Sequence, residues 1–316
     1  MSSLQELLPG IYVVPGPTNV GAVSVCTTEK KDVYLIDSGG SADDGARIYG
    51  ELESLFGKNE FTLKAVINTH SHADHSGGND YFVKKTGCGV WMSYLEKGSM
   101  ENTLIQSSVA WGGYPPPELQ TSYYVPAQCS VTRIISGDDK VTLDDGKKLS
   151  FIPLQGHYFG MLGVECTTKD GKNVIFTGDA VFGRTVIGKF SIPFMYSVGE
   201  FMKSLDTLCS TKAEWYVPSH GEAVTRIMET AEMNKLAVLE TVECIISILT
   251  KKKLSAEELL TAVANENGIP LKLPQYVLIG STLRSFLSYL YKTGHITYVI
   301  ENNKMLWSVK KQNIIR

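Results

Sequence analysis

The chain has 316 residues with a net charge of −3, and 43% of its residues are apolar while 20% are charged. This composition is that of an ordinary soluble globular protein, long enough for one large domain or two smaller ones. The small net charge excludes a global attraction to nucleic acid or anionic membranes, and no window of about 18 uninterrupted apolar residues suggests a membrane span.

The N-terminus and the cysteines indicate the compartment. Residues 1–14 have neither the basic region nor the long apolar stretch that signal peptides carry. The 6 cysteines are widely spaced and form no Cys-x-x-Cys pair, which is typical of reduced thiols in an intracellular protein. We therefore expect a cytoplasmic protein without a membrane anchor.

The first elements along the chain are expected to be strands followed by a helix. Apolar runs at 11–14, 22–26 and 32–36 predict a meander, and apolar spacing over 42–56 predicts a helix. Between them lies the motif Val33-Tyr34-Leu35-Ile36-Asp37-Ser38-Gly39. By itself, Asp37 there is typical of a residue that initiates a turn.

The densest group of candidate metal ligands follows the next apolar run, residues 63–68, which predicts a buried strand. Imidazole and carboxylate side chains suit zinc, iron or manganese, and the lack of cysteine excludes a thiolate-based zinc site here. Two histidines separated by one residue can bind one ion, and an adjacent Asp-His pair can reach a second. The group reads Thr69-His70-Ser71-His72-Ala73-Asp74-His75-Ser76-Gly77-Gly78.

Further candidate ligands each lie just beyond a predicted strand. Strands are expected at 131–135, 140–143, 148–154, 163–167 and 174–177, and a further apolar run lies at 214–219. Because strand ends at one edge of a sheet bring their loops together, side chains beyond them are expected to meet. A lone histidine or aspartate there is more often a cap, but a dense cluster with partners in order favours a metal centre. The partners are His157, Asp179 and His220.

The His-x-His-x-Asp-His pattern at 70–75, with these partners in this order, resembles the metallo-β-lactamase superfamily over about residues 10–225. The resemblance implies an α/β fold, the αββα sandwich, with metals at one edge of two mixed sheets. It also implies a particular ligand set, braced by Asp37. His70, His72 and His157 would hold one metal, Asp74, His75 and His220 would hold the other, and Asp179 would bridge both.

The resemblance further implies metal-assisted hydrolysis. Two divalent ions, zinc in the first instance with iron or manganese as alternatives, would lower the pKa of a bridging water so that hydroxide attacks the substrate. Asp74 would orient that hydroxide. Tyr158 is either an oxyanion donor or an ordinary packing aromatic, and both interpretations stay open. Many members read His-Thr-x-Gly-His here, whereas this chain reads His157-Tyr158-Phe159-Gly160-Met161, so this loop indicates little about substrate.

Two segments have the composition of pocket walls. Residues 102–130 contain only one charged residue, Glu118, and residues 182–198 directly follow Asp179, so they must lie near the metals. The alternative, compatible with the first, is that the 102–130 segment packs against its own domain or a dimer mate. The aromatic side chains predicted to shape a pocket for a small or slender substrate are Trp111, Tyr114, Phe190 and Tyr196.

The composition changes after the domain predicted at 1–225. Helices are expected at 231–250, after an N-cap at Ser255, and at 280–292, followed by a hairpin at 295–309. This order resembles a small winged-helix domain, at 226–316. Residues 251–316 hold 10 Lys/Arg against 4 Asp/Glu, so contact with nucleic acid is one interpretation, and packing or homodimer formation is the favoured one.

These observations predict a dinuclear metal-dependent hydrolase acting on a small ester, thioester or related substrate, without contact to membranes. The overall resemblance is to uncharacterised bacterial metallo-hydrolases with a similar tail. A metallo-endoribonuclease is an alternative, because one branch of the superfamily carries a C-terminal winged helix. A persulfide dioxygenase with one iron is another, because its ligand cluster is similar. A non-enzymatic binding module is disfavoured, since a dinuclear ligand set has little structural purpose at a domain edge.

Overall fold

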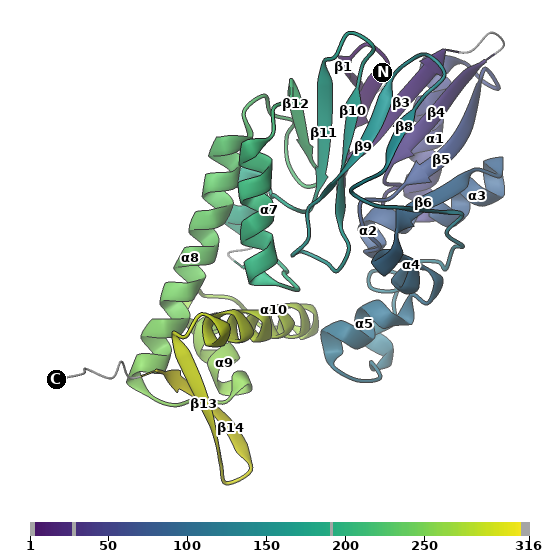
Figure 1. Cartoon of the computed structure of the whole chain (residues 1–316). Coiled ribbons are helices and arrows are strands. Elements are labelled where there is room, and N and C mark those ends of the chain that lie inside the picture. The colour runs from purple at the N-terminus through teal and green to yellow at the C-terminus, as the bar shows by residue number, and fades with distance from the viewer. Residues whose placement is uncertain (1–3, 27–29, 190–191, 311–316) are drawn as a thin grey trace.

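Two β-sheets packed face to face form a sandwich, with helices on their outer faces (Figure 1). The computed structural model describes residues 4–26, 30–189 and 192–310. Between the sheets lies a cluster of buried apolar side chains drawn from both of them, including Ile67, Val164 and Phe176. The predicted α/β sandwich of two mixed sheets is confirmed.

The first sheet has 7 strands in the described residues, and they lie side by side in chain order. The first four pair in antiparallel fashion, and the later ones are added in parallel. The strands are β1 (Gln5–Leu8), β2 (Ile11–Val14), β3 (Val20–Cys26), β4 (Lys31–Ile36), β5 (Phe61–Ile67), β6 (Gly89–Ser93) and β7 (Arg133–Ile135).

The second sheet has 5 strands among the described residues, in the order β12-β11-β10-β9-β8. All neighbours are antiparallel except β11 and β12, so β9, β11 and β12 run in the same direction. Their carboxyl ends therefore share one edge of the sheet. The strands are β8 (Lys140–Thr142), β9 (Lys148–Pro153), β10 (Leu162–Thr167), β11 (Asn173–Gly178) and β12 (Trp215–Pro218).

Helices α1 (Ala42–Phe56) and α3 (Asn79–Thr86) cover the outer face of the first sheet. Ile48 and Leu52 of α1 are fully buried there, which confirms the helix predicted from apolar spacing over 42–56. The short helices α2 (Ala73–Ser76), α4 (Tyr94–Glu101) and α5 (Leu104–Trp111) and a 3₁₀ turn at Pro117–Leu119 follow in the chain.

The C-terminal segment is helical and ends in a hairpin. After α6 (Arg184–Lys189) and α7 (Val198–Ser210) come α8 (Ile227–Lys251), α9 (Ala256–Glu266) and α10 (Leu273–Lys292). Ser255 caps α9 as predicted, in a capping box with Glu258. Strands β13 (Ile296–Glu301) and β14 (Lys304–Val309) form the hairpin, whose turn residues have positive φ angles. The winged-helix classification stays a prediction.

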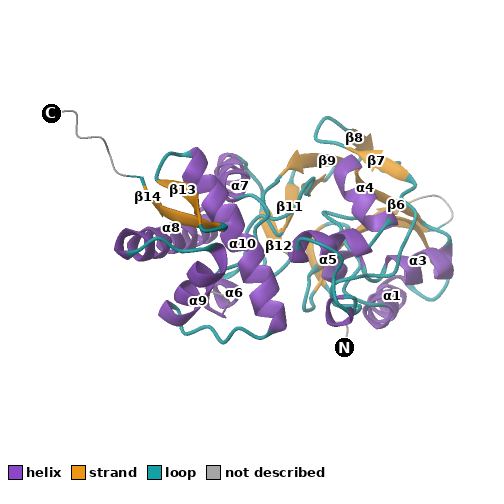
Figure 2. Cartoon of the chain, turned by 90° about the horizontal axis from the view of Figure 1, so that it is seen from below, coloured by secondary structure: helices purple, strands orange, loops and turns teal. Residues whose placement is uncertain are grey.

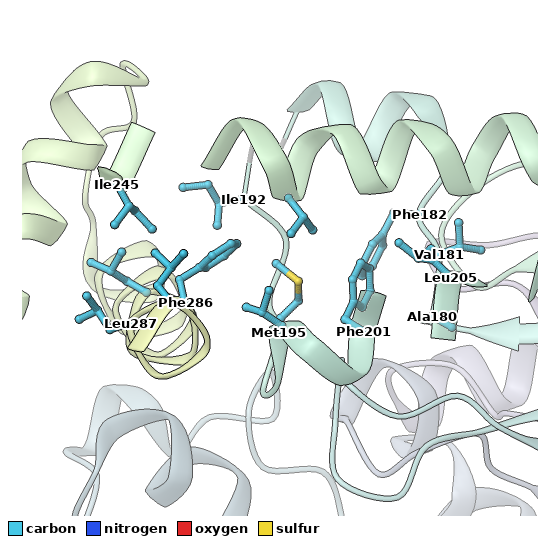
Figure 3. Close-up of a cluster of buried hydrophobic side chains, with 14 of the residues drawn as sticks. Ala180, Val181, Phe182, Ile192, Met195, Phe201, Leu205, Ile245, Phe286 and Leu287 are labelled. Carbon is cyan, nitrogen blue, oxygen red and sulfur yellow. The ribbon is translucent and has the colours of Figure 1, made fainter. Parts of the chain in front are cut away.

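One hydrophobic cluster joins the C-terminal helices to the sandwich. Figure 3 shows Met195 between Phe201 of α7 and Phe286 of α10, and all three side chains are fully buried. The packing therefore continues across residue 225, and the domain boundary placed there stays a prediction. Within the described ranges, no helix combines the length and apolarity needed to cross a bilayer.

Candidate metal centre

Four loops bring the candidate ligands together, each at the carboxyl end of a strand. The 70–75 group follows β5, which ends at Ile67, and its last residues form α2. The remaining ligands come from loops of the second sheet, where three strands run in the same direction. His157 follows β9, Asp179 follows β11 and His220 follows β12.

The side chains form three groups whose ligand atoms lie within 4.8 Å of one another. Every residue predicted as a ligand belongs to at least one group, and two of them belong to two groups. That these residues bind metal stays a proposal, taken up below. The groups are His70, His72 and His157; His70, His75 and Asp179; and Asp74, His75 and His220.

In the first group, three imidazoles point their ring nitrogens at one place. His70 Nε2 lies 3.0 Å from His72 Nδ1, and His157 Nε2 lies 2.9 Å from that same atom. His157 Nδ1 is 2.9 Å from the Phe194 carbonyl, to which it donates, so its Nε2 presents a lone pair. The Thr69 hydroxyl donates to Asp37 and thus accepts from His70 Nδ1, which frees His70 Nε2 in the same way.

Burial keeps these three histidines neutral. Burial is the largest cause that lowers the pKa of each of the three, and neighbouring histidines lower these pKa values further. For His72, burial and His157 lower the pKa to about 3. Neutral imidazoles with converging lone pairs repel each other unless a cation lies between them. The first group therefore fits a metal ion.

The second group joins carboxylates to histidines. His220 Nε2 lies 3.0 Å from Asp74 Oδ2, and His75 Nε2 lies 3.4 Å from Asp179 Oδ1. The Pro17 carbonyl accepts from His220 Nδ1 at 2.9 Å, which turns Nε2 toward the carboxylates. Among the described residues, buried His75 Nε2 and Asp179 Oδ1 have no hydrogen-bond partner. Unsatisfied buried polar atoms of this kind fit metal ligands.

The electrostatics of this group favour positive charge. Burial alone would lower the pKa of His75, but the carboxylates of Asp74, Asp179 and Asp37 outweigh it and raise that pKa well above its usual value. Likewise, burial would lower the pKa of His220, but Asp179 and Asp74 raise it to about 10. A site that holds protons so firmly also attracts metal cations, which would replace those protons.

Asp37 connects to the 69–75 loop through hydrogen bonds, and its bracing role stays a prediction. Its buried carboxylate accepts from Thr69 N at 2.8 Å and from His75 Nδ1 at 2.9 Å. These bonds orient the His75 ring so that Nε2 faces Asp74 and Asp179. The backbone of Asp37 is left-handed, with a φ of 64°, which aspartate tolerates better than most residues.

Two glycines allow the loop at 70–78 to pack directly on the loop at 37–40. A Cβ atom on Gly77 would lie 2.3 Å from the Gly40 oxygen, and one on Gly78 would lie 2.2 Å from the Ser38 oxygen. No side chain fits at such distances. The close approach allows Ser38 N to donate to the His75 carbonyl at 2.8 Å.

Sequence reasoning missed Glu96, a fully buried carboxylate that joins two ligand loops. Glu96 accepts from Ser71 N at 3.0 Å and from Ser71 Oγ at 2.7 Å, and from Gly160 N at 2.7 Å. Ser71 lies between the first two histidines, and Gly160 follows His157. The available signal was the Ser93-x-x-Glu96 pattern, which indicates a helix cap and gives no hint of this contact.

A cavity of about 180 Å³ opens beside the ligands. One side is formed by the candidate ligands His72, Asp74, His157 and Asp179, and the other walls come from the segments at 104–111, 123–124 and 194 and from α10. The remaining lining residues are Ala73, Gln106, Val109, Ala110, Tyr123, Tyr124, Tyr158, Phe194 and Leu278.

The two predicted segments reach the cavity, but three of the four predicted aromatic side chains do not line it. Trp111 and Tyr114 are 43% and 76% exposed, and neither they nor Tyr196 line it. The walls use Val109, Ala110, Tyr123 and Tyr124 from the first segment and Phe194 from the second. Phe190 lies outside the described residues.

Tyr158 lines the cavity with its ring and not with its hydroxyl. The ring packs on His72 with a centroid distance of 4.2 Å. The hydroxyl is buried near Ser99, without a well-formed hydrogen bond among the described residues, and burial raises its pKa. This geometry fits the packing aromatic and does not support the oxyanion donor.

A family model of the metallo-beta-lactamase superfamily matches residues 13–220, and the chain belongs to this superfamily. Its members are generally metal-dependent hydrolases.

Individual relatives are distant. The chain is 25% identical to the hydroxyacylglutathione hydrolase GloC of Haemophilus influenzae over 179 residues, which is 55% of this chain and 75% of that protein. A beta-lactamase domain protein of Burkholderia ambifaria has a TM-score of 0.77 at 16% identity, covering 97% of this chain and 94% of its own. A metallo-beta-lactamase family protein of Thermus thermophilus has a TM-score of 0.68 at 18% identity, covering 96% and 100%. These structural likenesses show the fold, and they extend over the C-terminal segment.

Proposed function

We propose that the protein is a dinuclear metal-dependent hydrolase of small esters or thioesters. The observation that carries this proposal is the convergence of seven donor side chains from four loops, with unsatisfied atoms on His75 and Asp179. The nitrogen and oxygen donors suit zinc, with iron or manganese as alternatives. The similarity to a hydroxyacylglutathione hydrolase favours ester-like bonds.

The ligand set supplies the roles that such a reaction needs. Divalent ions, when bound, would lower the pKa of water and polarise the oxygen of the scissile bond. His70, His72 and His157 would hold one ion, and Asp74, His75 and His220 the other. Asp179 lies 3.4 Å from both His157 Nε2 and His220 Nε2, between the two sets, and would bridge them.

Asp74 is the ligand with a further role. Its side chain is 49% exposed, lines the cavity and lies 3.3 Å from the Thr18 hydroxyl, which donates to it. A carboxylate that is both a ligand and open to the cavity can accept a proton from the attacking water. The remaining ligands are more deeply buried and are suited to binding alone.

The test is Asp74→Ala, with Asp138→Ala on an exposed turn as the matched control. We expect Asp74→Ala to lose at least about 100-fold in kcat/KM on a p-nitrophenyl ester while its circular dichroism spectrum stays that of the parent. Elemental analysis of the parent protein should give two metal ions per chain. Full activity of Asp74→Ala under limiting metal would overturn the mechanism.

The alternative functions are separated by the same preparation. A single bound iron together with oxygen uptake on a persulfide would establish the dioxygenase. Metal-dependent RNA cleavage that falls steeply with salt would establish the nuclease, because contacts to phosphates release counterions. Among the described lining residues none is lysine or arginine, which favours the small-molecule substrate.

A further inference from the structure

The cavity has two unlike halves. One half carries the candidate ligands, and the other is largely apolar and includes Val109, Ala110 and Leu278. The Phe194 ring packs on the ligands, with its centroid 5.5 Å from those of His72 and His157. The half-buried Leu278 belongs to α10, which packs against α5 (Figure 2). The C-terminal segment thus closes the cavity on the side away from the sandwich.

Helix α10 also forms hydrogen bonds with the loop at 194–196, which in turn contacts the candidate ligand His157. Its Thr282 hydroxyl accepts from Met195 N at 3.3 Å, and its Ser285 hydroxyl donates to the Tyr196 carbonyl at 2.8 Å. The same loop accepts from His157 Nδ1 and donates from Tyr196 N to the His157 carbonyl at 3.1 Å. The position of α10 is therefore fixed relative to His157, which lines the same cavity as Leu278.

The described lining of the cavity includes two carboxylates and no lysine or arginine. Its titratable side chains, in the part of the chain that the structure describes, are the candidate ligands and the tyrosines, and no cation is among them. A substrate carboxylate placed against the apolar half would be desolvated without a partner, which is costly. A volume of about 180 Å³ is also small beside the several hundred Å³ of most ligand pockets.

We infer that the cavity between α5 and α10 binds an uncharged, slender apolar group of the substrate, such as a short aliphatic acyl chain, and that Leu278 of the C-terminal segment sets its length. This inference rests on the proposed hydrolase function and specifies its substrate. It makes the C-terminal segment part of the active site. It also distinguishes this protein from an enzyme for glutathione thioesters, whose leaving group carries two carboxylates.

The expected size of the effect follows from burial of methylene groups. Each one that enters an apolar site contributes enough transfer free energy for about a fourfold gain in kcat/KM. From an acetyl to a hexanoyl thioester, the gain should therefore reach about 100-fold or more until the cavity is filled. A glutathione thioester should be at least about tenfold slower than a neutral thioester of the same acyl group.

The experiment uses the metal-loaded full chain and thioesters of N-acetylcysteamine with acetyl, butyryl and hexanoyl groups, beside butyrylglutathione. Leu278→Ala should shift the preference further toward hexanoyl, because the cavity becomes longer, and Leu278→Phe should shift the preference toward acetyl. The matched control is Leu273→Ala, at an exposed leucine of the same helix that does not line the cavity. It should behave as the parent does.

Three results would overturn the inference while leaving the hydrolase intact: a flat series, equal effects of the two alanine variants, or a preference for butyrylglutathione. If no thioester or ester is cleaved, the proposed function fails instead, and the inference is judged by binding. Hexanoate should then raise the Tm of the parent more than acetate does, and this difference should vanish in Leu278→Phe, whose larger side chain shortens the cavity. Equal shifts by both carboxylates would refute it.

Discussion

Replacing Glu96 by glutamine tests whether its carboxylate sets the distance between two ligand loops. One carboxylate oxygen accepts two bonds from Ser71, and the other accepts one from Gly160 N at 2.7 Å. Burial raises the pKa of Glu96, and the donors of Ser71 and Gly160 counteract that rise. Glutamine keeps the shape but offers only one accepting oxygen, so one loop must face an NH₂ group.

Glu96→Gln should lower the free energy of unfolding in two ways. At least one buried hydrogen bond to a charged acceptor is lost and its donor is left unsatisfied, which costs about 1.5–3 kcal/mol of unfolding free energy. Misplaced ligand loops should weaken metal binding by about 10–100-fold, as changes beside a ligand shell do. Under saturating metal this weaker binding removes about a further 1.4–2.8 kcal/mol of stability.

The assay is urea unfolding of Glu96→Gln and the parent, first with chelator and then with saturating zinc. The expected loss is larger with zinc than with chelator, because only the zinc-bound protein reports on ligand placement. Glu229→Gln is the control, since this glutamate is 71% exposed and pairs with Arg226 at the surface. Equal stability of Glu96→Gln and the parent under both conditions would refute the role assigned to Glu96.

Two further changes probe the centre. Chelation should lower the Tm by at least about 5 °C, and the ion held by Asp74 and His220 should leave first, because these side chains are 49% and 20% exposed while His70 is fully buried. Elemental analysis at graded chelator concentrations checks this order, and simultaneous loss of both ions contradicts it. Gly78→Ala should cost about 1–3 kcal/mol in urea unfolding, because its Cβ would lie 2.2 Å from the Ser38 oxygen. A Gly78→Ala variant as stable as the parent would show that the loop yields.

The positions of the candidate ligands were predictable because two local signals coincide at each of them. Apolar runs fix where a strand lies, and a histidine or aspartate directly after it must emerge at the strand end. This holds for His157, Asp179 and His220. Because β9, β11 and β12 run in the same direction, these three side chains emerge at the same edge of the sheet. The helix at 42–56 was equally clear, since its apolar face is wide and Ser41 caps it.

The cavity walls were not predictable, because the facing of a short helix depends on its neighbours. Gln106, Val109 and Ala110 are spaced by three and four residues and so share one face of α5, which lines the cavity. Trp111 is the next residue along the helix and therefore points about 100° away from Ala110. A tryptophan is a stronger composition signal than an alanine, but the packing of α5 on α10 decides which residue faces inward.

The basic composition of the C-terminal segment and its part in the site are separate properties. The 10 Lys/Arg of residues 251–316 suggest an anionic partner, yet the residue that α10 contributes to the cavity is Leu278. Some of the positive charge is neutralised locally, since Arg284 pairs with Glu257 at 2.8 Å and Lys253 with Glu301 at 2.7 Å. A nuclease would need such cations beside the scissile bond, where the described cavity walls include no lysine or arginine. Any anion bound by this segment would therefore lie outside the reaction site, while α10 acts in it through shape and apolar contact.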